Sequence, residues 1–234
     1  IVYDVFSVGN FYNRTDSDSR FVRHDSATAG TDNFIAGNNA GDAIASGGNE
    51  NTLIGNEAGT ALTTGDANVA VGFEALATED ANGQNVAVGY RALKTLNAGL
   101  DSQNTAVGYN AGTSITTGRE NTIMGATAGD AFTDADFNIA IGWGALGADT
   151  KGSKSVAIGV GALDAQNFTS STDVFNIAIG HAAGSDVTSG TNNTFVGGLA
   201  GAKCTSGSHN TAIGYGSFGG VDGSSANNGE QNTC

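Results

Sequence analysis

One phrase of nine residues recurs along most of this chain, and it constrains the fold more than any other feature of the sequence. The phrase reads Asn-x-x-(apolar)-Gly-x-x-Ala-(Gly/Leu). Its copies begin at Asn33, Asn51, Asn68, Asn85, Asn104, Asn121, Asn138, Ser155, Asn176, Asn193 and Asn210. Most steps between copies are 17 residues, and the longer steps of 18, 19 and 21 indicate insertions. A short fixed period predicts similar units that stack on one another.

Two columns of the repeat predict a strand in each unit. The residue three after each Asn is always apolar: Ala36, Ile54, Val71, Val88, Val107, Met124, Ile141, Ile158, Ile179, Val196 and Ile213. The residue one after it is β-branched in every copy except the first, which has Phe34. Side chains two apart in a strand share a face. We therefore interpret the column three after the Asn as the core.

Glycine and asparagine mark the corners of each unit. Glycine stands four residues after every Asn, which indicates a positive φ or a close backbone approach, and a second glycine fourteen residues after it marks another turn in seven copies. We predict an all-β fold, a parallel β-solenoid or β-roll of about eleven 17-residue coils that is on the order of 50 Å long. Its asparagines would form a ladder of amide hydrogen bonds, interrupted at Ser155.

The column two after the Asn is also apolar and mostly alanine. It includes Ala70, Ala87, Ala106, Ala140, Ala157, Ala178 and Ala212. A strand that is apolar on both faces is typical of a strand buried on both faces. We therefore predict that this alanine column is the seam of a homo-oligomer and that the isolated chain is not a stable monomer.

The repeated phrases resemble a known family. Asn-Val-Ala-Val-Gly at 68–72 and 85–89, Asn-Ile-Ala-Ile-Gly at 138–142 and 176–180, and Ser-Val-Ala-Ile-Gly at 155–159 are similar to the head repeats of YadA-like trimeric autotransporter adhesins and to repeats in bacteriophage tail fibres. The resemblance covers residues 33–218. It implies a left-handed, homotrimeric β-roll in an adhesin or tail fibre, located outside the cell, at the cell surface or on a virion. Those heads favour a repeat near fourteen residues, and this chain shows no coiled-coil stalk or membrane anchor.

Both ends fall outside the repeat. Residues 1–32, which open with an apolar strand-like segment, are expected to be an N-terminal cap or a donated strand that docks on the next subunit. Residues 33–218 form the β-solenoid domain. Residues 219–234 are a tail, in which Asn232-Thr233-Cys234 is the start of a truncated twelfth repeat.

Composition excludes several classes of partner. The formal charge of −14 argues against nucleic acid and anionic membranes, and no apolar run is long enough to insert into a membrane. The chain has 37 glycines but no proline, which excludes collagen. Because 39% of the residues are hydrophobic, the chain is also unlike a disordered tail.

The sequence offers little for catalysis or for a cofactor. The G-x-G-x-x-G phrases at 142–147 and 214–219 lie inside the repeat, so we interpret them as turns. The three histidines, His24, His181 and His209, have no spacing typical of a metal site or a triad. Acidic stretches at 79–80 and 134–136 are either solvated loop charge or adventitious cation sites. We predict no enzyme, no cofactor and no specific metal site.

Aromatic residues recur five positions after the Asn, as Phe73, Tyr90, Tyr109, Trp143 and Tyr215. Evenly spaced rings on one line of a rod suit stacking on sugars, but aromatic columns are more common in packing at subunit seams. The column is the sequence's candidate surface for a cell-surface or matrix receptor, including a glycan.

Two questions stay open from sequence. Cys204 is either a buried small hydrophobic residue or the partner of Cys234 in a disulfide. The function is either attachment by a rigid trimeric rod or, as the alternative, a structural filament that polymerises end to end through residues 1–32.

Overall fold

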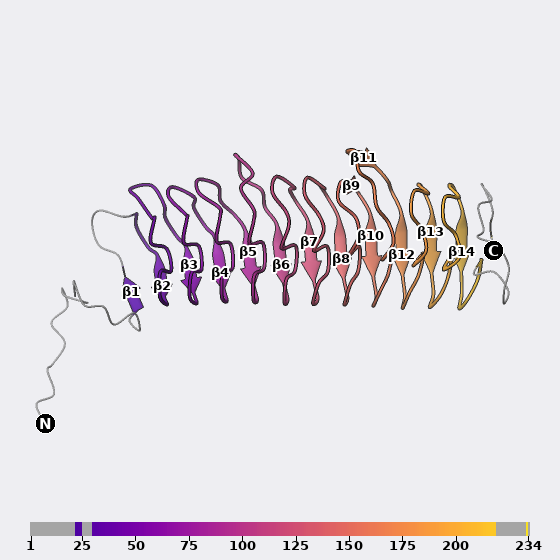
Figure 1. Cartoon of the computed structure of the whole chain (residues 1–234), viewed down its shortest axis with the longest axis horizontal. Coiled ribbons are helices and arrows are strands. Elements are labelled where there is room, and N and C mark those ends of the chain that lie inside the picture. Colours follow the sequence, from indigo (N-terminus) through magenta and orange to yellow (C-terminus); the bar gives the residue numbers. More distant parts are fainter. Residues whose placement is uncertain (1–21, 25–29, 219–232, 234) are drawn as a thin grey trace, which may run out of the picture.

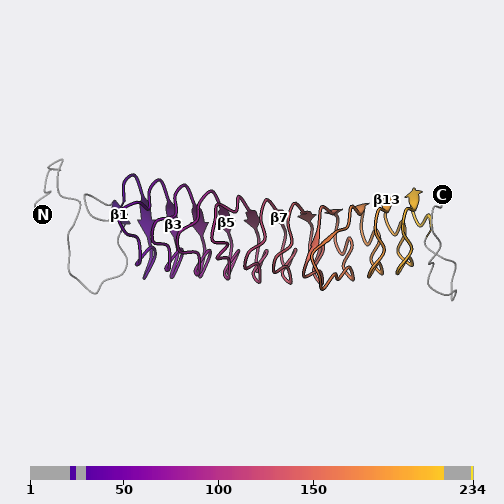
Figure 2. The ribbon, with the colours of Figure 1, turned by 90° about the horizontal axis from the view of Figure 1, so that it is seen from above.

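The computed structural model describes residues 22–24, 30–218 and 233, which form an elongated rod of stacked coils (Figures 1 and 2). The described residues contain strands and turns and no helix. There are about eleven coils of about 17 residues, one for each copy of the sequence phrase. The predicted all-β parallel β-solenoid is therefore confirmed.

Each coil contributes one three-residue strand to a single long sheet, and one further strand precedes the first coil. The strands are β1 (Val22–His24), β2 (Phe34–Ala36), β3 (Thr52–Ile54), β4 (Val69–Val71), β5 (Val86–Val88), β6 (Thr105–Val107), β7 (Thr122–Met124), β8 (Ile139–Ile141), β10 (Val156–Ile158), β12 (Ile177–Ile179), β13 (Thr194–Val196) and β14 (Thr211–Ile213). The short strands β9 (Gly152–Ser153) and β11 (Thr172–Asp173) pair with each other at the insertion that lengthens one coil. From β2 to β14 the pairing is parallel and in register, so that equivalent positions stack along the rod. The strands lie across the rod axis, as predicted (Figure 1).

The two ends of the sheet differ. At the N-terminal edge, β1 pairs antiparallel with β2, with Arg23 opposite Ile35. The apolar segment at residues 1–6 lies outside the described residues. At the other end Thr233 forms a parallel bridge with Thr211. Both threonines directly follow an asparagine, so Thr233 occupies the position that a twelfth coil requires, while most of the 219–234 tail is outside the described residues.

The glycine column needs glycine for two reasons. The backbone φ at these positions lies between 116° and 146°, a region that L side chains rarely adopt. The coils also approach closely there: a Cβ built on Gly89 would lie 2.2 Å from the carbonyl oxygen of Gly108 in the next coil. The predicted line of stacked glycines is confirmed.

A second corner uses the left-handed conformation without glycine. Each of the eleven residues that directly precede the asparagine column has φ between 53° and 65°, and among them are Ala67, Glu120 and Phe137. A left-handed backbone costs an ordinary residue about 1–2 kcal/mol. The hydrogen bonds of the adjacent asparagine hold this corner, and nothing in the residue types at these positions revealed it.

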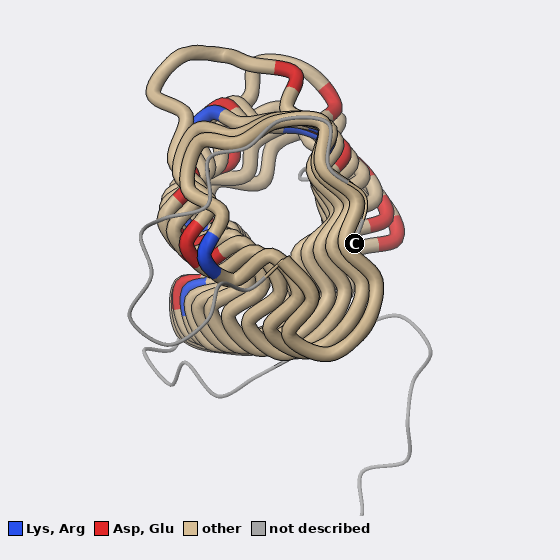
Figure 3. The backbone as a smooth tube through the Cα atoms, turned by 90° about the vertical axis from the view of Figure 1, so that its right-hand side faces the viewer, with Lys and Arg blue, Asp and Glu red and all other residues tan. Residues whose placement is uncertain are grey.

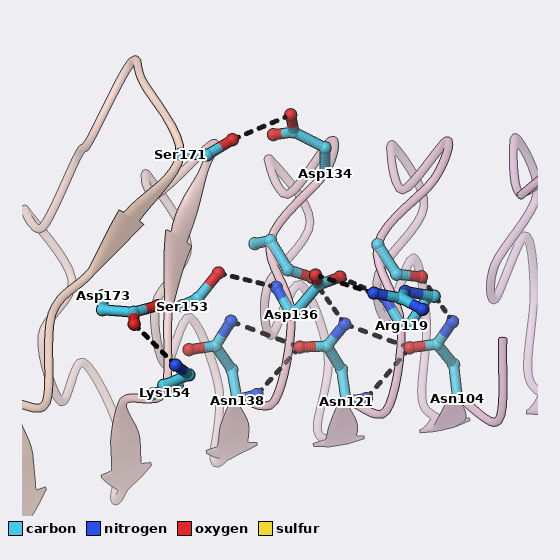
Figure 4. A network of polar contacts seen from close by, with 12 residues as sticks. Asn104, Arg119, Asn121, Asp134, Asp136, Asn138, Ser153, Lys154, Ser171 and Asp173 are labelled. Carbon is cyan, nitrogen blue, oxygen red and sulfur yellow. Dashed lines mark hydrogen bonds and ion pairs between the residues drawn. The ribbon is translucent and has the colours of Figure 1, made fainter.

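The buried asparagines form the predicted ladder (Figure 4). Asn121 is 1% exposed and is representative. Its Nδ2 donates to Asn104 Oδ1 at 3.0 Å and to the Ala135 carbonyl at 2.8 Å, which closes its own coil. Its Oδ1 accepts the backbone N–H of Asn138 at 2.9 Å. Each rung therefore joins three coils and satisfies backbone groups at a buried corner.

The interruption of the ladder at Ser155 is repaired by a glutamine. Gln166 lies in the interior, and its Nε2 donates to Ser155 Oγ at 3.2 Å and to Asp149 Oδ2 at 2.6 Å. Its Oε1 accepts from Nδ2 of Asn176, the next asparagine of the column, at 2.9 Å. The ladder is thus diverted through Gln166 rather than cut.

The structure reverses the two faces that we assigned to the strand. The alanine column, Ala70, Ala87, Ala106, Ala140, Ala157, Ala178 and Ala212, lies inside the coils with 0% exposure. The columns one and three after the asparagine point outward, and none of their members is buried. The interpretation of the column three after the asparagine as the core is therefore wrong. So is the prediction of an alanine seam, because side chains enclosed by their own chain cannot contact another copy.

The interior is filled by matching large residues to small ones across the coil. Where the position two after the asparagine is large, as in Leu53 and Phe195, the position six residues further on is glycine. A Cβ on Gly59 would lie 2.8 Å from Leu53 Cδ2, and a Cβ on Gly201 would lie 2.5 Å from the ring of Phe195. Where the first position is alanine, the second is usually leucine. In nine of the eleven coils a large residue is thus paired with a small one, and Ala106 with Gly112 and Ala178 with Gly184 are the two exceptions.

Candidate functional site

The aromatic column lies on the surface of the rod, directly after the glycine corner. Tyr90 is 37% exposed, Tyr109 54%, Trp143 61% and Tyr215 83%, while Phe73 is half-buried. The rings of Phe73, Tyr90 and Tyr109 stack face to face, with successive centroids 5.3 Å and 5.2 Å apart. The structure thus brings three of the five predicted aromatics into one continuous stack and leaves Trp143 and Tyr215 further along the same line.

Charged side chains support the stack from the adjacent column. The guanidinium of Arg91 lies 4.9 Å from the centroid of Tyr90 and 5.9 Å from that of Phe73, both within the range of cation–π contacts. Glu74 Oε2 accepts from Arg91 Nε at 2.6 Å and from Lys94 Nζ at 2.7 Å. The hydrogen bond from Lys94, followed by that from Arg91, lowers the pKa of Glu74. The cluster holds Arg91 against the rings.

The outward face of the long sheet is the second surface feature. Its two columns are apolar or threonine in every coil from β2 to β14. Its exposed large apolar members are Phe34, Ile54, Met124, Ile177, Ile179 and Ile213. These strands carry no Lys, Arg, Asp or Glu. Seen along the rod, the charged residues gather on the other walls (Figure 3). A continuous exposed apolar strip of this length is typical of an interaction surface.

The remaining candidates do not form a site in the described residues. His181 and His209 are exposed on separate coils, and His24 lies in β1. Asp134 and Asp136 form ion pairs with Lys151 and Arg119, each at 3.7 Å. Within residues 22–24, 30–218 and 233, no group of three His, Cys, Asp or Glu side chains could hold a metal ion, and no helix is long and apolar enough to cross a membrane.

The G-x-G-x-x-G phrase at 142–147 forms a turn in a coil, and no helix follows it. Gly142 and Gly144 have φ of 128° and 65°, so both serve the corner. The last residue of the second phrase, 214–219, lies outside the described residues. Of the two thiols, Cys204 is free and fully buried, and its Sγ contacts the Gly207 carbonyl at 3.6 Å. The small hydrophobic role predicted for Cys204 is confirmed, and Cys234 is outside the described residues.

Reading the sequence by columns missed three buried polar residues. Glu79, Asp149 and Gln166 occupy the position eleven after the asparagine, which most other coils fill with an apolar side chain such as Leu96. All three are 0% exposed. Asp149 accepts from Gln166 and from the backbone N–H groups of Gly152 and Phe168. Their polar character at an apolar column was the signal that could have revealed them.

Of these three buried side chains, Glu79 has the least complete hydrogen bonding. Its Oε1 accepts from Asn82 Nδ2 at 2.6 Å, whereas its Oε2 is buried without a hydrogen-bond partner. Burial raises the pKa of Glu79, since the charged form is poorly solvated inside the coil.

We expect Glu79→Gln to remove one source of pH dependence from the stability. A carboxyl whose pKa is raised by folding favours the folded state below the unfolded pKa of about 4.3, and this contribution is lost as pH rises through the folded pKa. Between pH 4 and pH 8, the melting temperature of the variant should therefore increase relative to that of wild type as pH rises. Glu120→Gln, at an exposed carboxylate, is the control. A constant difference between Glu79→Gln and wild type across this range would contradict the assignment.

Comparison of the chain with protein-family models, with curated proteins and with solved structures finds no match in any of the three.

Proposed function

We propose that this chain is a non-enzymatic extracellular rod that assembles with copies of itself into an attachment fibre, at a cell surface or on a virion. The observation that carries the proposal is the uncharged, outward-facing apolar strip of the sheet, which runs along the coils and is exposed in a single chain. The resemblance of the repeats to adhesin heads and tail fibres favours three copies and a left-handed β-roll. The receptor is a cell-surface or matrix molecule.

The seam of this assembly is the outer strip and not the alanine column. Three copies that turn their outer columns toward a common axis would bury the strip, and the polar and charged walls would stay in water. Closed assembly of this kind explains why the sheet is apolar on both faces: one face fills the coil and the other meets the neighbouring copies.

The alternative of an end-to-end filament through residues 1–32 has less support. β1 already pairs with β2 and covers the N-terminal edge of the sheet. A strand donated by a second rod could pair with this side of β2 only by displacing β1, since each side of a strand accepts one partner. This pairing is the support for discrete rods over an end-to-end filament.

Adjacent residues on opposite faces of β5 give a direct test of the seam. Val88→Glu combined with Ile141→Glu places charges on the outer strip, where the side chains are half-buried. We expect this variant to remain folded and to sediment as a monomer. Ala87→Glu places a charge in the closed interior, where Ala87 is 0% exposed, and we expect it to unfold the coil.

Analytical ultracentrifugation and circular dichroism of the same samples separate assembly from folding. Lys151→Glu, on a loop, is the control for added charge and should assemble as wild type does. An oligomer that survives Val88→Glu with Ile141→Glu, or a wild-type chain that is monomeric at all concentrations, would contradict the proposed seam.

A further inference from the structure

The aromatic column is interrupted between Tyr109 and Trp143. The intervening coil carries Ala126 at this position, and its methyl group is half-buried. The stack that begins at Phe73 therefore ends at Tyr109. Tyr109 and Trp143, on either side of Ala126, are 54% and 61% exposed.

The spacing at this interruption matches one missing ring. Coils of a parallel sheet are about 4.8 Å apart, so the positions of Tyr109 and Trp143 are separated by about 10 Å along the rod. Successive rings in the intact stack are 5.3 Å and 5.2 Å apart. A ring placed above Ala126 would therefore lie at stacking distance from both neighbours.

A second small residue, Gly198, also interrupts the column. At Gly198 the next ring, Tyr215, leans back over the glycine: a Cβ built on Gly198 would lie 3.4 Å from Tyr215 Cδ2. That position is covered by the chain's own side chain. On the other side of Ala126 from Trp143, Tyr109 stacks on Tyr90, in the direction away from Ala126.

We propose that the position above Ala126 binds a single pyranose ring of a receptor glycan, held between Tyr109 and Trp143. This inference rests on the proposed attachment function and names the ligand class of that surface. A saccharide suits the location because its hydroxyl groups remain in water at the exposed rim while its C–H groups meet the rings. The polar residues Asn110 and Thr127 directly follow Tyr109 and Ala126 in the sequence.

Contact on both faces predicts a preference among sugars. A β-glucopyranoside has its substituents equatorial, so axial C–H groups cover both faces of its ring. An axial hydroxyl, as in mannose or galactose, makes one face polar and would desolvate that hydroxyl against a ring. We therefore expect the site to favour gluco-configured rings.

Trp143 is the only tryptophan of the chain, so its fluorescence reports on this site alone. The wild-type rod, first shown by sedimentation to be assembled, is titrated with methyl β-glucopyranoside, cellobiose and methyl α-mannopyranoside. We expect a saturable change with the first two sugars at about millimolar concentration, and a response at least about tenfold weaker with the mannoside.

The most direct test is a variant that fills the position above residue 126 with a side chain. Ala126→Phe supplies the missing ring from the chain itself, so it should abolish the sugar response without loss of assembly or melting temperature. Tyr109→Ala should weaken binding at least about tenfold, read from the same Trp143 signal. Tyr215→Ala, further along the column, is the matched control and should bind as wild type does.

Three outcomes would overturn the inference. The first is a wild-type rod that assembles but shows no response of Trp143 to any of the three sugars. The second is a response to N-acetyl-tyrosine amide and not to sugars, which would indicate docking of an aromatic side chain. The third concerns quenching of Trp143 fluorescence by acrylamide. If Trp143 is shielded from quenching in the assembled rod but accessible in the variant Val88→Glu with Ile141→Glu, the aromatic column lies at a seam. Loss of assembly itself would refute the proposed function instead.

Discussion

Gly89→Ala is expected to destabilise the rod by at least about 4 kcal/mol, as measured by the midpoint of urea unfolding followed by circular dichroism. The new methyl group would lie 2.2 Å from the Gly108 carbonyl oxygen. That oxygen belongs to the backbone of the next coil, so it cannot move aside without breaking the strand pairing on both sides. The backbone φ of 139° adds strain for any L side chain.

Gly99→Ala separates strain from collision. Gly99 has a φ of 72°, and a Cβ at this position meets nothing within 4 Å. We expect a cost of about 1 kcal/mol there, from the left-handed backbone alone. Equal losses of stability in Gly89→Ala and Gly99→Ala would show that the close approach of the coils is not the reason that glycine recurs in this column.

The corners and the ladder were predictable because they depend on the backbone. Only glycine fits the φ of the corner, and only a short amide at the asparagine column both donates and accepts along the axis. These requirements are the same in every coil, so they appear in the sequence as nearly invariant columns. Chain length per coil and in-register stacking followed from the same columns.

The assignment of the two strand faces failed because alternation alone does not say which face is enclosed. Both faces of β4, Val-Ala-Val, are apolar. The enclosed face could have been identified from residue sizes at two positions of the repeat. Leu53 is paired with Gly59 six residues later, whereas Ala70 is paired with Leu76. Residues that compensate each other in volume must share a closed space. That correlation between two columns identifies the alanine face as the interior.

The candidate surface was predicted in part. Five aromatic residues were placed on one line of the rod, and their exposure is now known. The interruption at Ala126 gained meaning only once ring stacking of Tyr90 on Tyr109 had set the spacing. Arg91, which lies over the rings, was not anticipated, because its column otherwise carries residues of many kinds.

Asn121→Ala is expected to cost at least about 3 kcal/mol. It would leave the Ala135 carbonyl and the N–H of Asn138 without partners, since each bonds to the side chain of Asn121. It would also remove one of the two hydrogen bonds that Asn104 Oδ1 accepts from residue 121. Buried groups that lose a partner cost about 1–3 kcal/mol each. The measurement is again the urea midpoint, and Asn97→Ala, at an exposed side chain, should change stability by less than about 0.5 kcal/mol.

Asn121→Ser tests whether the ladder or the asparagine itself matters. Serine is the natural residue at position 155, where Gln166 bonds to its hydroxyl and carries the ladder to Asn176. The equivalent position in the coil of Asn121 is Phe132, which can do neither. We therefore expect Asn121→Ser to cost nearly as much as Asn121→Ala. A serine tolerated at position 121 would mean that the rungs act independently and that Gln166 only fills space. A large cost would mean that stability passes from coil to coil through an unbroken chain of amides.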